Sequence, residues 1–127
     1  MIHVTNILVD LEKLIDDHRA DINNIKQLKQ IITKTSPQII IHLAAQPLVR
    51  YSYTNPIETY ETNVMGTANI LEASRYSDSL KVILVVTTDK CYENADKVYS
   101  FKETDQLGGF DPYSSSKACS ELITHAY

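Results

Sequence analysis

Apolar residues recur at helical spacing in two long stretches of the chain. The first stretch predicts an amphipathic helix over residues 24–35, with Asn23 or Asn24 as its N-cap. Asn55-Pro56 begins the second helix, because Asn can cap a helix and Pro suits its first position. We expect this second helix to run to about Ser74 or Arg75. Its apolar positions trace one face: Ile57, Tyr60, Val64, Ala68 and Leu71.

Two short apolar runs, rich in β-branched residues, lie between the predicted helices. Gln38–Ala44 and Lys81–Val86 predict strands buried on both faces, and His18–Ile22 is a weaker candidate for an edge strand. Leu48–Thr54 is predicted to be a connector, and Asp111-Pro112 begins the last helix. Because strands and helices alternate, we expect parallel strands joined by crossover helices. The pattern therefore predicts an α/β fold that forms part of a three-layer αβα sandwich.

Composition narrows the class of protein. The chain has 127 residues, a formal charge of −4 and no basic run, so we expect one domain and no nucleic-acid partner. No apolar stretch is long enough to cross a membrane, and Met1–Asp10 lacks the features of a signal peptide. Cys91 and Cys119 have no paired spacing, which indicates reduced thiols and a cytoplasmic protein. Met1–Leu14 fits part of a helix.

Polar and ionisable residues directly follow the second apolar run. Thr88, Asp89 and Lys90 come just after Lys81–Val86, at the carboxyl edge of the predicted sheet, where open α/β sheets bind ligands. Thr88 can hydrogen-bond a substrate oxygen, Asp89 can act as an acid or base, and Lys90 is a cation or, if its pKa is lowered, a base. Taken in isolation, Asp89-Lys90 favours a solvated turn over a catalytic pair.

Tyr113 and Lys117 lie four residues apart at the start of the last helix, so they share a helix face. A cation beside a phenol favours its ionised form, so Tyr113 can serve as a general base near neutral pH. The chain has 8 tyrosines, so the spacing alone fits a surface helix with an extended lysine just as well. The position of the pair after Thr88-Asp89-Lys90 favours the catalytic interpretation.

Other polar residues are weaker candidates for a site. Asp21 follows a possible strand end and could accept a hydrogen bond from an exocyclic amine, although a helix-capping Asp is the simpler interpretation. His42 lies inside an apolar run, which is typical of a core histidine. Arg50 could pair with a phosphate or be an ordinary surface arginine. The remaining histidines are too scattered to suggest a metal site.

Four motifs occur in an order shared with a known family. They read His42-Leu43-Ala44-Ala45-Gln46, Asn63-Val64-Met65-Gly66-Thr67, Thr88-Asp89 and Tyr113-Ser114-Ser115-Ser116-Lys117. From about Asp21 onward the chain resembles the extended short-chain dehydrogenases/reductases that act on nucleotide sugars. The longer stretches HLAAQPLVRYSY, NPIETYETNVMGT, TTDKCYEN and GGFDPYSSSK resemble the CDP-glucose 4,6-dehydratases within it. The resemblance implies a partial Rossmann-type, NAD-binding domain over residues 1–127, without a substrate domain.

The resemblance also implies a reaction and a role for each matching residue. CDP-glucose would become CDP-4-keto-6-deoxyglucose with loss of water. Tyr113 would take the proton of the sugar 4-hydroxyl, while Lys117 would hold the nicotinamide ribose. Thr88 would hydrogen-bond the 4-oxygen, and Asp89 would protonate the departing C6 hydroxyl. Asn63 would support a cofactor site lined by Asp21, Ile22, Leu43, Ala44, Ala45 and Gln46.

The sequence departs from the family pattern in two ways. Dehydratases of dTDP-glucose carry a Glu, the C5 base, after the Asp, whereas this chain has Lys90, which leaves that base unassigned. Only Gly66, Gly108 and Gly109 are present, so the Gly-rich phosphate loop is missing, as is the C-terminal sugar-nucleotide domain. We therefore expect a fragment with little or no activity alone, from a parent that dimerises through the helices begun at Asn55 and Asp111.

Two other interpretations fit the sequence. The first is another nucleotide-sugar enzyme of the same fold, an epimerase or decarboxylase, in which Asp89 would have no C6 hydroxyl to expel. The second is a non-catalytic α/β module that keeps the motifs without using them, an interpretation supported by the missing Gly-rich loop. Product analysis separates the first from a dehydratase, and an NAD titration separates the second.

Overall fold

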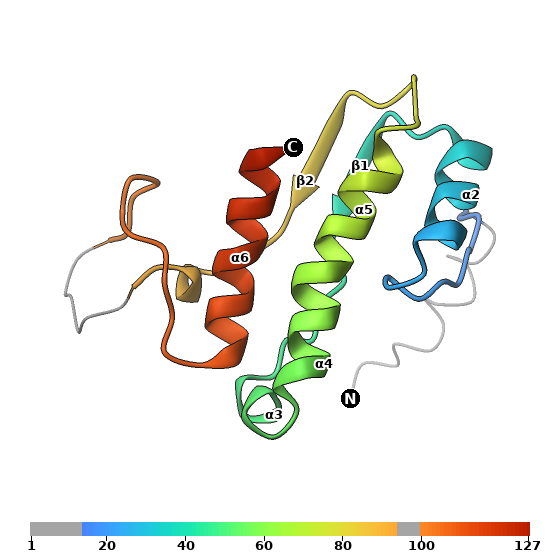
Figure 1. The fold of residues 1–127 in the computed structure, drawn as a ribbon. Coiled ribbons are helices and arrows are strands. Elements are labelled where there is room, and N and C mark those ends of the chain that lie inside the picture. Colours follow the sequence, from blue (N-terminus) through green and yellow to red (C-terminus); the bar gives the residue numbers. More distant parts are fainter. Residues whose placement is uncertain (1–13, 94–99) are drawn as a thin grey trace, which may run out of the picture.

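The computed structural model describes residues 14–93 and 100–127. Its strands pair in parallel, with Ile39 opposite Val82 and His42 opposite Val85. The helices α5 (Gly66–Ser74) and α6 (Pro112–Ala126) lie side by side, and α2 (Ile25–Thr35) packs on the other side of α5 (Figure 1). In chain order the elements are α2 (Ile25–Thr35), β1 (Ile39–His42), α3 (Val49–Thr54), α4 (Pro56–Tyr60), the π-helix η1 (Glu61–Met65), α5 (Gly66–Ser74), β2 (Val82–Val85), the 3-10 helix η2 (Asp89–Cys91) and α6 (Pro112–Ala126).

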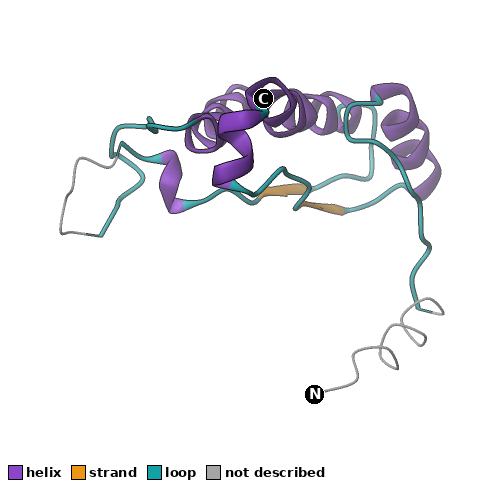
Figure 2. Ribbon diagram, turned by 90° about the horizontal axis from the view of Figure 1, so that it is seen from below, coloured by secondary structure: helices purple, strands orange, loops and turns teal. Residues whose placement is uncertain are grey.

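The helices cover one face of the sheet, and the described residues leave the other face open (Figure 2). The outward side chains of the strands are therefore exposed, from 52% to 61%: Ile39, Ile41, Val82 and Leu84. The prediction that both strands are buried on both faces is wrong for the described part of the chain. An apolar run shows that a strand suits burial, but covering its second face takes another layer. Two of the three predicted layers are thus present.

The sequence predicts α2 well because its local signals agree. The side chain of Asn24 caps the helix by accepting a hydrogen bond from the main-chain N–H of Gln27 at 3.2 Å. Ser36, in the left-handed region at φ 45°, ends it. One face of the helix packs on α5 through a small core made of Leu28, Ile32 and Ala73, with Ile22, Ile40 and Ile70 around it.

The predicted second helix runs from Pro56 to Ser74 as α4, η1 and α5 in succession. Asn55 does not cap it with its side chain, whose amide instead donates to the Thr54 hydroxyl at 2.9 Å. The helix turns a largely polar face inward, with Thr59, Asn63, Gly66, Thr67, Leu71, Ala73 and Ser74 buried. Of the apolar face traced in the sequence, only Leu71 is buried; Tyr60, Val64 and Ala68 are half-buried, and Ile57 is 69% exposed.

Three other segments differ from the sequence-based expectations or lie outside the structure. Leu48–Thr54 contains a helix, α3, because its buried Ser52 accepts a hydrogen bond from the Tyr113 amide of α6 at 3.2 Å. His18–Ile22 is not an edge strand; it is irregular and leads into a turn closed by an Asn24 N–H to Asp21 C=O bond of 2.9 Å. The predicted helix within Met1–Leu14 falls almost wholly outside the described residues.

Candidate active site

The carboxyl ends of the two strands lie next to each other. The Val86 amide donates to the His42 carbonyl at 3.1 Å, which extends the ladder one step past the strands. The segments Leu43–Gln46 and Thr87–Lys90 therefore leave the same edge of the sheet. This is the edge at which open parallel sheets bind ligands.

Lys117 reaches this edge from α6. Its ammonium group donates to the Val86 carbonyl at 3.1 Å, and the residue is only 7% exposed. Burial lowers the pKa of Lys117, and the nearby carboxylate of Glu121 acts in the opposite direction. Burial, followed by the charge of Lys117, also lowers the pKa of His42. His42 is a core histidine, as predicted, and its Nε2 lies 3.2 Å from the Thr67 hydroxyl.

Thr88 caps the short helix η2 at the end of the second strand. Its hydroxyl accepts a hydrogen bond from the Lys90 amide at 3.3 Å and donates to the Asp89 carboxylate at 3.1 Å. Asp89 and Lys90 are exposed and line a cavity of about 210 Å³. The other side of this cavity is formed by residues before and at the start of α6, namely Tyr92, Gly109, Phe110, Asp111 and Ser114.

The start of α6 is built to approach this cavity closely. Asp111 caps the helix, because its carboxylate accepts from the Ser114 amide at 2.9 Å and from the Ser114 hydroxyl at 2.6 Å. Gly109 has φ 133°, and a Cβ there would stand 2.6 Å from the Ser114 Cβ. The glycine thus lets the incoming loop lie against the first turn, which carries Tyr113, itself 9% exposed.

Asn63 fixes the loop that follows β1. Its side-chain oxygen accepts a hydrogen bond from the main-chain N–H of Gln46 at 2.8 Å, and its side-chain NH₂ group donates to the main-chain carbonyl of Gln46 at 3.1 Å. The same amide group donates to the Ser116 hydroxyl on α6 at 2.9 Å. Asn63 is 1% exposed and lies in the π-helix η1, a feature that often marks functional sites. One buried side chain therefore joins the β1 loop to α6.

The residues at this edge fall into two connected groups. Thr88, Asp89 and Lys90 meet the start of α6, and Gln46 is tied to Asn63. Leu43 and Ala44 are exposed and Ala45 is half-buried between β1 and the Asn63 clamp, which leaves the backbone of this loop open to a ligand. Ser116 of the YSSSK motif belongs to both groups, because it also donates to the Tyr113 carbonyl at 2.6 Å.

Three predicted residues lie outside these groups. The carboxylate of Asp21 accepts from the Asn23 amide at 2.8 Å, so Asp21 braces the entry to α2. Ile22 packs against the start of α5, where a Cβ on Gly66 would stand 2.9 Å from its side chain. Arg50 is exposed on α3, and it has no hydrogen bond or ion pair within residues 14–93 and 100–127.

The sequence did not indicate two of the contacts at this edge. The hydroxyl of Thr87 donates to the carboxylate of Glu121, one helical turn after Lys117. Ser52 of α3 holds the amide of Tyr113. The spacing of Lys117 and Glu121 was the one available signal for the first contact, because residues four apart share a helix face. For Ser52 there was no signal, since α3 itself was not predicted.

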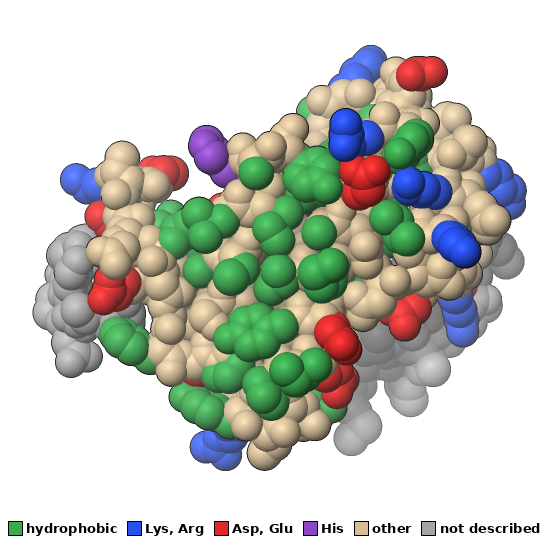
Figure 3. All heavy atoms as spheres, in the orientation of Figure 1, with side chains coloured by type: hydrophobic (Ala, Val, Ile, Leu, Met, Phe, Trp, Pro, Cys, Tyr) green, Lys and Arg blue, Asp and Glu red, His purple; other side chains and the backbone are tan. Residues whose placement is uncertain are grey.

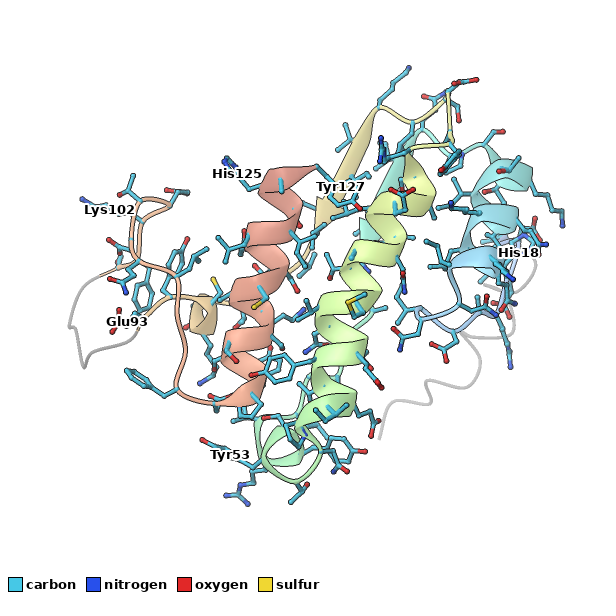
Figure 4. The ribbon with its side chains drawn as sticks, in the orientation of Figure 1. His18, Tyr53, Glu93, Lys102, His125 and Tyr127 are labelled. Carbon is cyan, nitrogen blue, oxygen red and sulfur yellow. The ribbon has the colours of Figure 1, made fainter. Side chains whose placement is uncertain are left out.

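The described residues contain no group of three potential ligands that could hold a metal ion. Two of the histidines, His18 near α2 and His125 at the end of α6, lie on opposite sides of the molecule (Figure 4).

Within residues 14–93 and 100–127, no helix is both long and apolar enough to span a membrane.

A two-stranded parallel sheet with crossover helices, and a Tyr-Lys pair at its carboxyl edge, define part of a Rossmann-type nucleotide-binding enzyme. The fold agrees with that of the UDP-glucose 4-epimerase from Brucella ovis in complex with NAD, with a TM-score of 0.79 and 27% identity over 88% of this chain and 34% of that one. The chain belongs to the family described as GDP-mannose 4,6 dehydratase, whose model matches residues 3–127.

Two further relatives are similar over most of the chain. The CDP-glucose 4,6-dehydratase of Salmonella typhimurium is 45% identical over 120 residues, which are 94% of this chain and 33% of that protein. The dTDP-glucose 4,6-dehydratase 1 of Escherichia coli is 31% identical over 93% of this chain and 37% of that protein. The chain therefore spans about a third of the length of the relatives that it matches.

Proposed function

We propose that this chain is the catalytic edge of an NAD-dependent CDP-glucose 4,6-dehydratase. The observation that carries the proposal is the junction of β2 with α6, where the Lys117 ammonium group meets the Val86 carbonyl at 3.1 Å. Thr88 and Tyr113 belong to the two segments joined there. The 45% identity to a CDP-glucose 4,6-dehydratase supports this substrate over other nucleotide sugars. A single NAD-binding domain over residues 1–127 is part of the proposal.

The residues present fit one part of a dinucleotide. The small side chains of Ala44 and Ala45 leave room beside the β1 loop, and Lys117 has further N–H donors beyond the one given to Val86. The glycines are engaged elsewhere, since a Cβ on Gly66, Gly108 or Gly109 would stand 3.1 Å or less from a neighbouring residue. We therefore assign the cofactor contacts to Leu43–Gln46, Asp21, Ile22, Asn63, Tyr113 and Lys117, and none of them to a pyrophosphate turn.

Each proposed catalytic residue has a separate task in the reaction. When bound, NAD⁺ supplies the acceptor for a hydride from C4 and the donor that returns it to C6. Tyr113 takes the proton of the 4-hydroxyl, and Lys117, one helical turn later, holds the nicotinamide ribose. Thr88 donates a hydrogen bond to the 4-oxygen. The resulting 4-ketone acidifies the C5 proton, and Asp89 protonates the C6 hydroxyl as it leaves.

Lys90 is the remaining candidate at the cavity. It is exposed beside Asp89, where it can remove the C5 proton only as the neutral amine. Arg50 is a candidate contact for the nucleotide phosphates, because a guanidinium suits phosphate and that of Arg50 has no partner in the described part of the chain. The cytoplasmic location expected from unpaired thiols also stays a prediction; Cys91 and Cys119 are both free.

Product analysis tests this function. The full-length protein that contains these 127 residues is incubated with CDP-glucose and NAD⁺, and the product is identified by NMR and mass spectrometry. We expect a 4-keto-6-deoxy sugar, and we expect Tyr113→Phe and Lys117→Met to abolish its formation. Epimerisation without loss of water would replace the proposal with an epimerase. A calorimetric titration that detects no NAD⁺ binding would favour a non-catalytic module.

We also propose that the full-length protein is a homodimer formed through the outer faces of α4–α5 and α6. Apolar side chains gather on this face (Figure 3), and Ile57, Met65 and Leu122 are 69%, 54% and 59% exposed. Analytical ultracentrifugation tests it: Met65→Glu should shift the protein toward monomer, whereas the exposed Thr33→Glu on α2 should not. A monomeric wild-type protein would refute this part of the proposal.

A further inference from the structure

The end of β2 is fastened to α6 at two adjacent residues. Lys117 donates to the main-chain carbonyl of Val86 at 3.1 Å, and the side chain of Thr87 donates to the carboxylate of Glu121. Because Lys117 and Glu121 lie one turn apart, they present a cation and an anion on the same face of α6. Both contacts end directly before Thr88, which opens η2.

The Lys117–Val86 and Thr87–Glu121 hydrogen bonds differ in their relation to the proposed function. Lys117 is assigned to the cofactor, so its ammonium group must serve a ligand as well as Val86. The hydrogen-bond partner of Glu121 is the side chain of Thr87, which is not among the groups proposed to touch cofactor or sugar. The bond between Glu121 and Thr87 can therefore persist unchanged when the site is filled.

Glu121 accepts the hydrogen bond of Thr87, and its negative charge also acts on neighbouring titratable groups. Lys117 lies one turn earlier on α6, and Asp89, Cys91 and Tyr92 lie on or beside η2. His125 and Glu103 line a cavity of about 320 Å³ that Glu121 shares. The negative charge of Glu121 raises the pKa of Lys117 against the effect of burial, and it adds to the effect of burial in raising the pKa of the Cys91 thiol.

We propose that Glu121 is a positioning residue that, through the hydroxyl of Thr87, holds Thr88 and Asp89 in register with Tyr113 and Lys117. The proposal rests on the proposed function, since it gives Thr88 and Asp89 a reacting sugar to face. A displacement of about 1 Å at such groups can lower a rate by about 100-fold. The loss of the fastening should thus lower kcat more than it raises KM.

Four variants of the full-length protein separate the hydrogen bond from the charge. Thr87→Val removes the donor and keeps the shape, whereas Thr87→Ser restores the donor. Glu121→Ala removes acceptor and charge, whereas Glu121→Gln keeps an acceptor oxygen and removes only the charge. Glu103→Gln, on the rim of the same cavity, is the matched control.

We expect Thr87→Val and Glu121→Ala to lower kcat by about 10- to 100-fold, with KM changed by less than about threefold. Thr87→Ser, Glu121→Gln and the Glu103→Gln control should retain most of the activity. For Glu121→Gln, the basic limb of the kcat–pH profile should move to lower pH, because Lys117 loses the charge that raises its pKa. Wild-type kcat in Thr87→Val and Glu121→Ala would overturn the proposal.

Amide hydrogen exchange gives a second readout that needs no activity. Thr87→Val and Glu121→Ala should speed exchange of the Lys90 and Cys91 amides, which bond to Thr88, by about tenfold, while amides of α2 stay unchanged. Unchanged exchange at Lys90 and Cys91 would overturn the proposal even if kcat fell. If the wild-type protein has no dehydratase activity, the proposed function fails, and the exchange experiment still decides whether Glu121 holds this segment.

Discussion

Asn63→Ala should destabilise the chain more than any surface substitution, because Asn63 makes three hydrogen bonds while 1% exposed. The change leaves the main-chain N–H and carbonyl of Gln46 without their partner, and it removes one partner of the Ser116 hydroxyl. At about 1 kcal/mol net for each bond, the loss is about 3 kcal/mol of unfolding free energy. For a domain of this size that corresponds to a drop in Tm of about 10 °C.

Asn63→Asp should be no better than Asn63→Ala, although it is almost the same shape. A carboxylate can accept from the main-chain N–H of Gln46. Its second oxygen, however, would face the main-chain carbonyl of Gln46, to which the side-chain NH₂ group of Asn63 donates at 3.1 Å. Two acceptors would then oppose each other, and a buried charge would stand without a cation. The amide group itself is what Gln46 requires.

Urea unfolding of the 127-residue chain, followed by circular dichroism, measures these losses. Asn69→Ala is the matched control, because Asn69 lies on the same helix, is half-buried, and makes one bond, to the Ile22 carbonyl at 3.2 Å. The control should cost about 1 kcal/mol. A loss below about 1 kcal/mol for Asn63→Ala would refute the view that this side chain clamps the β1 loop.

Three further predictions concern the same site. Gly109→Ala should cost about 2 kcal/mol or more in urea unfolding, because its φ of 133° disfavours a side chain and the new Cβ would meet Ser114 at 2.6 Å. Asp111→Ala should cost about 1–2 kcal/mol, whereas Asp111→Asn should cost less, since Asn also caps helices. The lowered pKa of His42 means that the unfolded chain binds a proton more readily, so the free energy of unfolding should fall as the pH drops below about 6.5, and His42→Gln should flatten that slope. A slope that is unchanged in His42→Gln would contradict the assignment.

Local signals in the sequence determine much of the fold. The Asn24 cap and the apolar spacing of α2 agree with its packing, and the two β-branched runs form the two strands. Asp111-Pro112 begins α6 with a side-chain cap. In each case the residues that mark the element in the sequence also help to stabilise it. The element can therefore be predicted without knowledge of contacts between distant parts of the chain.

The remainder depends on contacts between distant parts of the chain. The face of α4–α5 that packs inward is largely polar, because the main-chain carbonyl of Asn63 accepts hydrogen bonds from the Thr67 hydroxyl and, across to α6, from the Ser120 hydroxyl. A rule that turns apolar residues inward therefore misses the polar side chains that this helix buries, and it places Ile57, which is 69% exposed, in the core. The helix α3 is too short for periodicity to identify, and Ser52 stabilises it through a residue 61 positions away.

The candidate site was partly accessible from the sequence. The strand-end position of Thr88-Asp89-Lys90 and the Tyr113–Lys117 spacing indicated where to look, and the structure brings these segments together at one cavity and one hydrogen bond. The bond between Thr87 and Glu121 could not be predicted, because the orientation of α6 on the sheet decides which residue faces the strand end.

The fate of the hydrogen on C4 tests the central proposal most directly. The full-length protein is given CDP-glucose deuterated at C4, with NAD⁺, and the product is read by deuterium NMR. The proposal predicts a product that has lost water and carries the deuterium at C6, and it predicts no transfer in Tyr113→Phe. Deuterium that stays at C4, in a product that has lost no water, would contradict it.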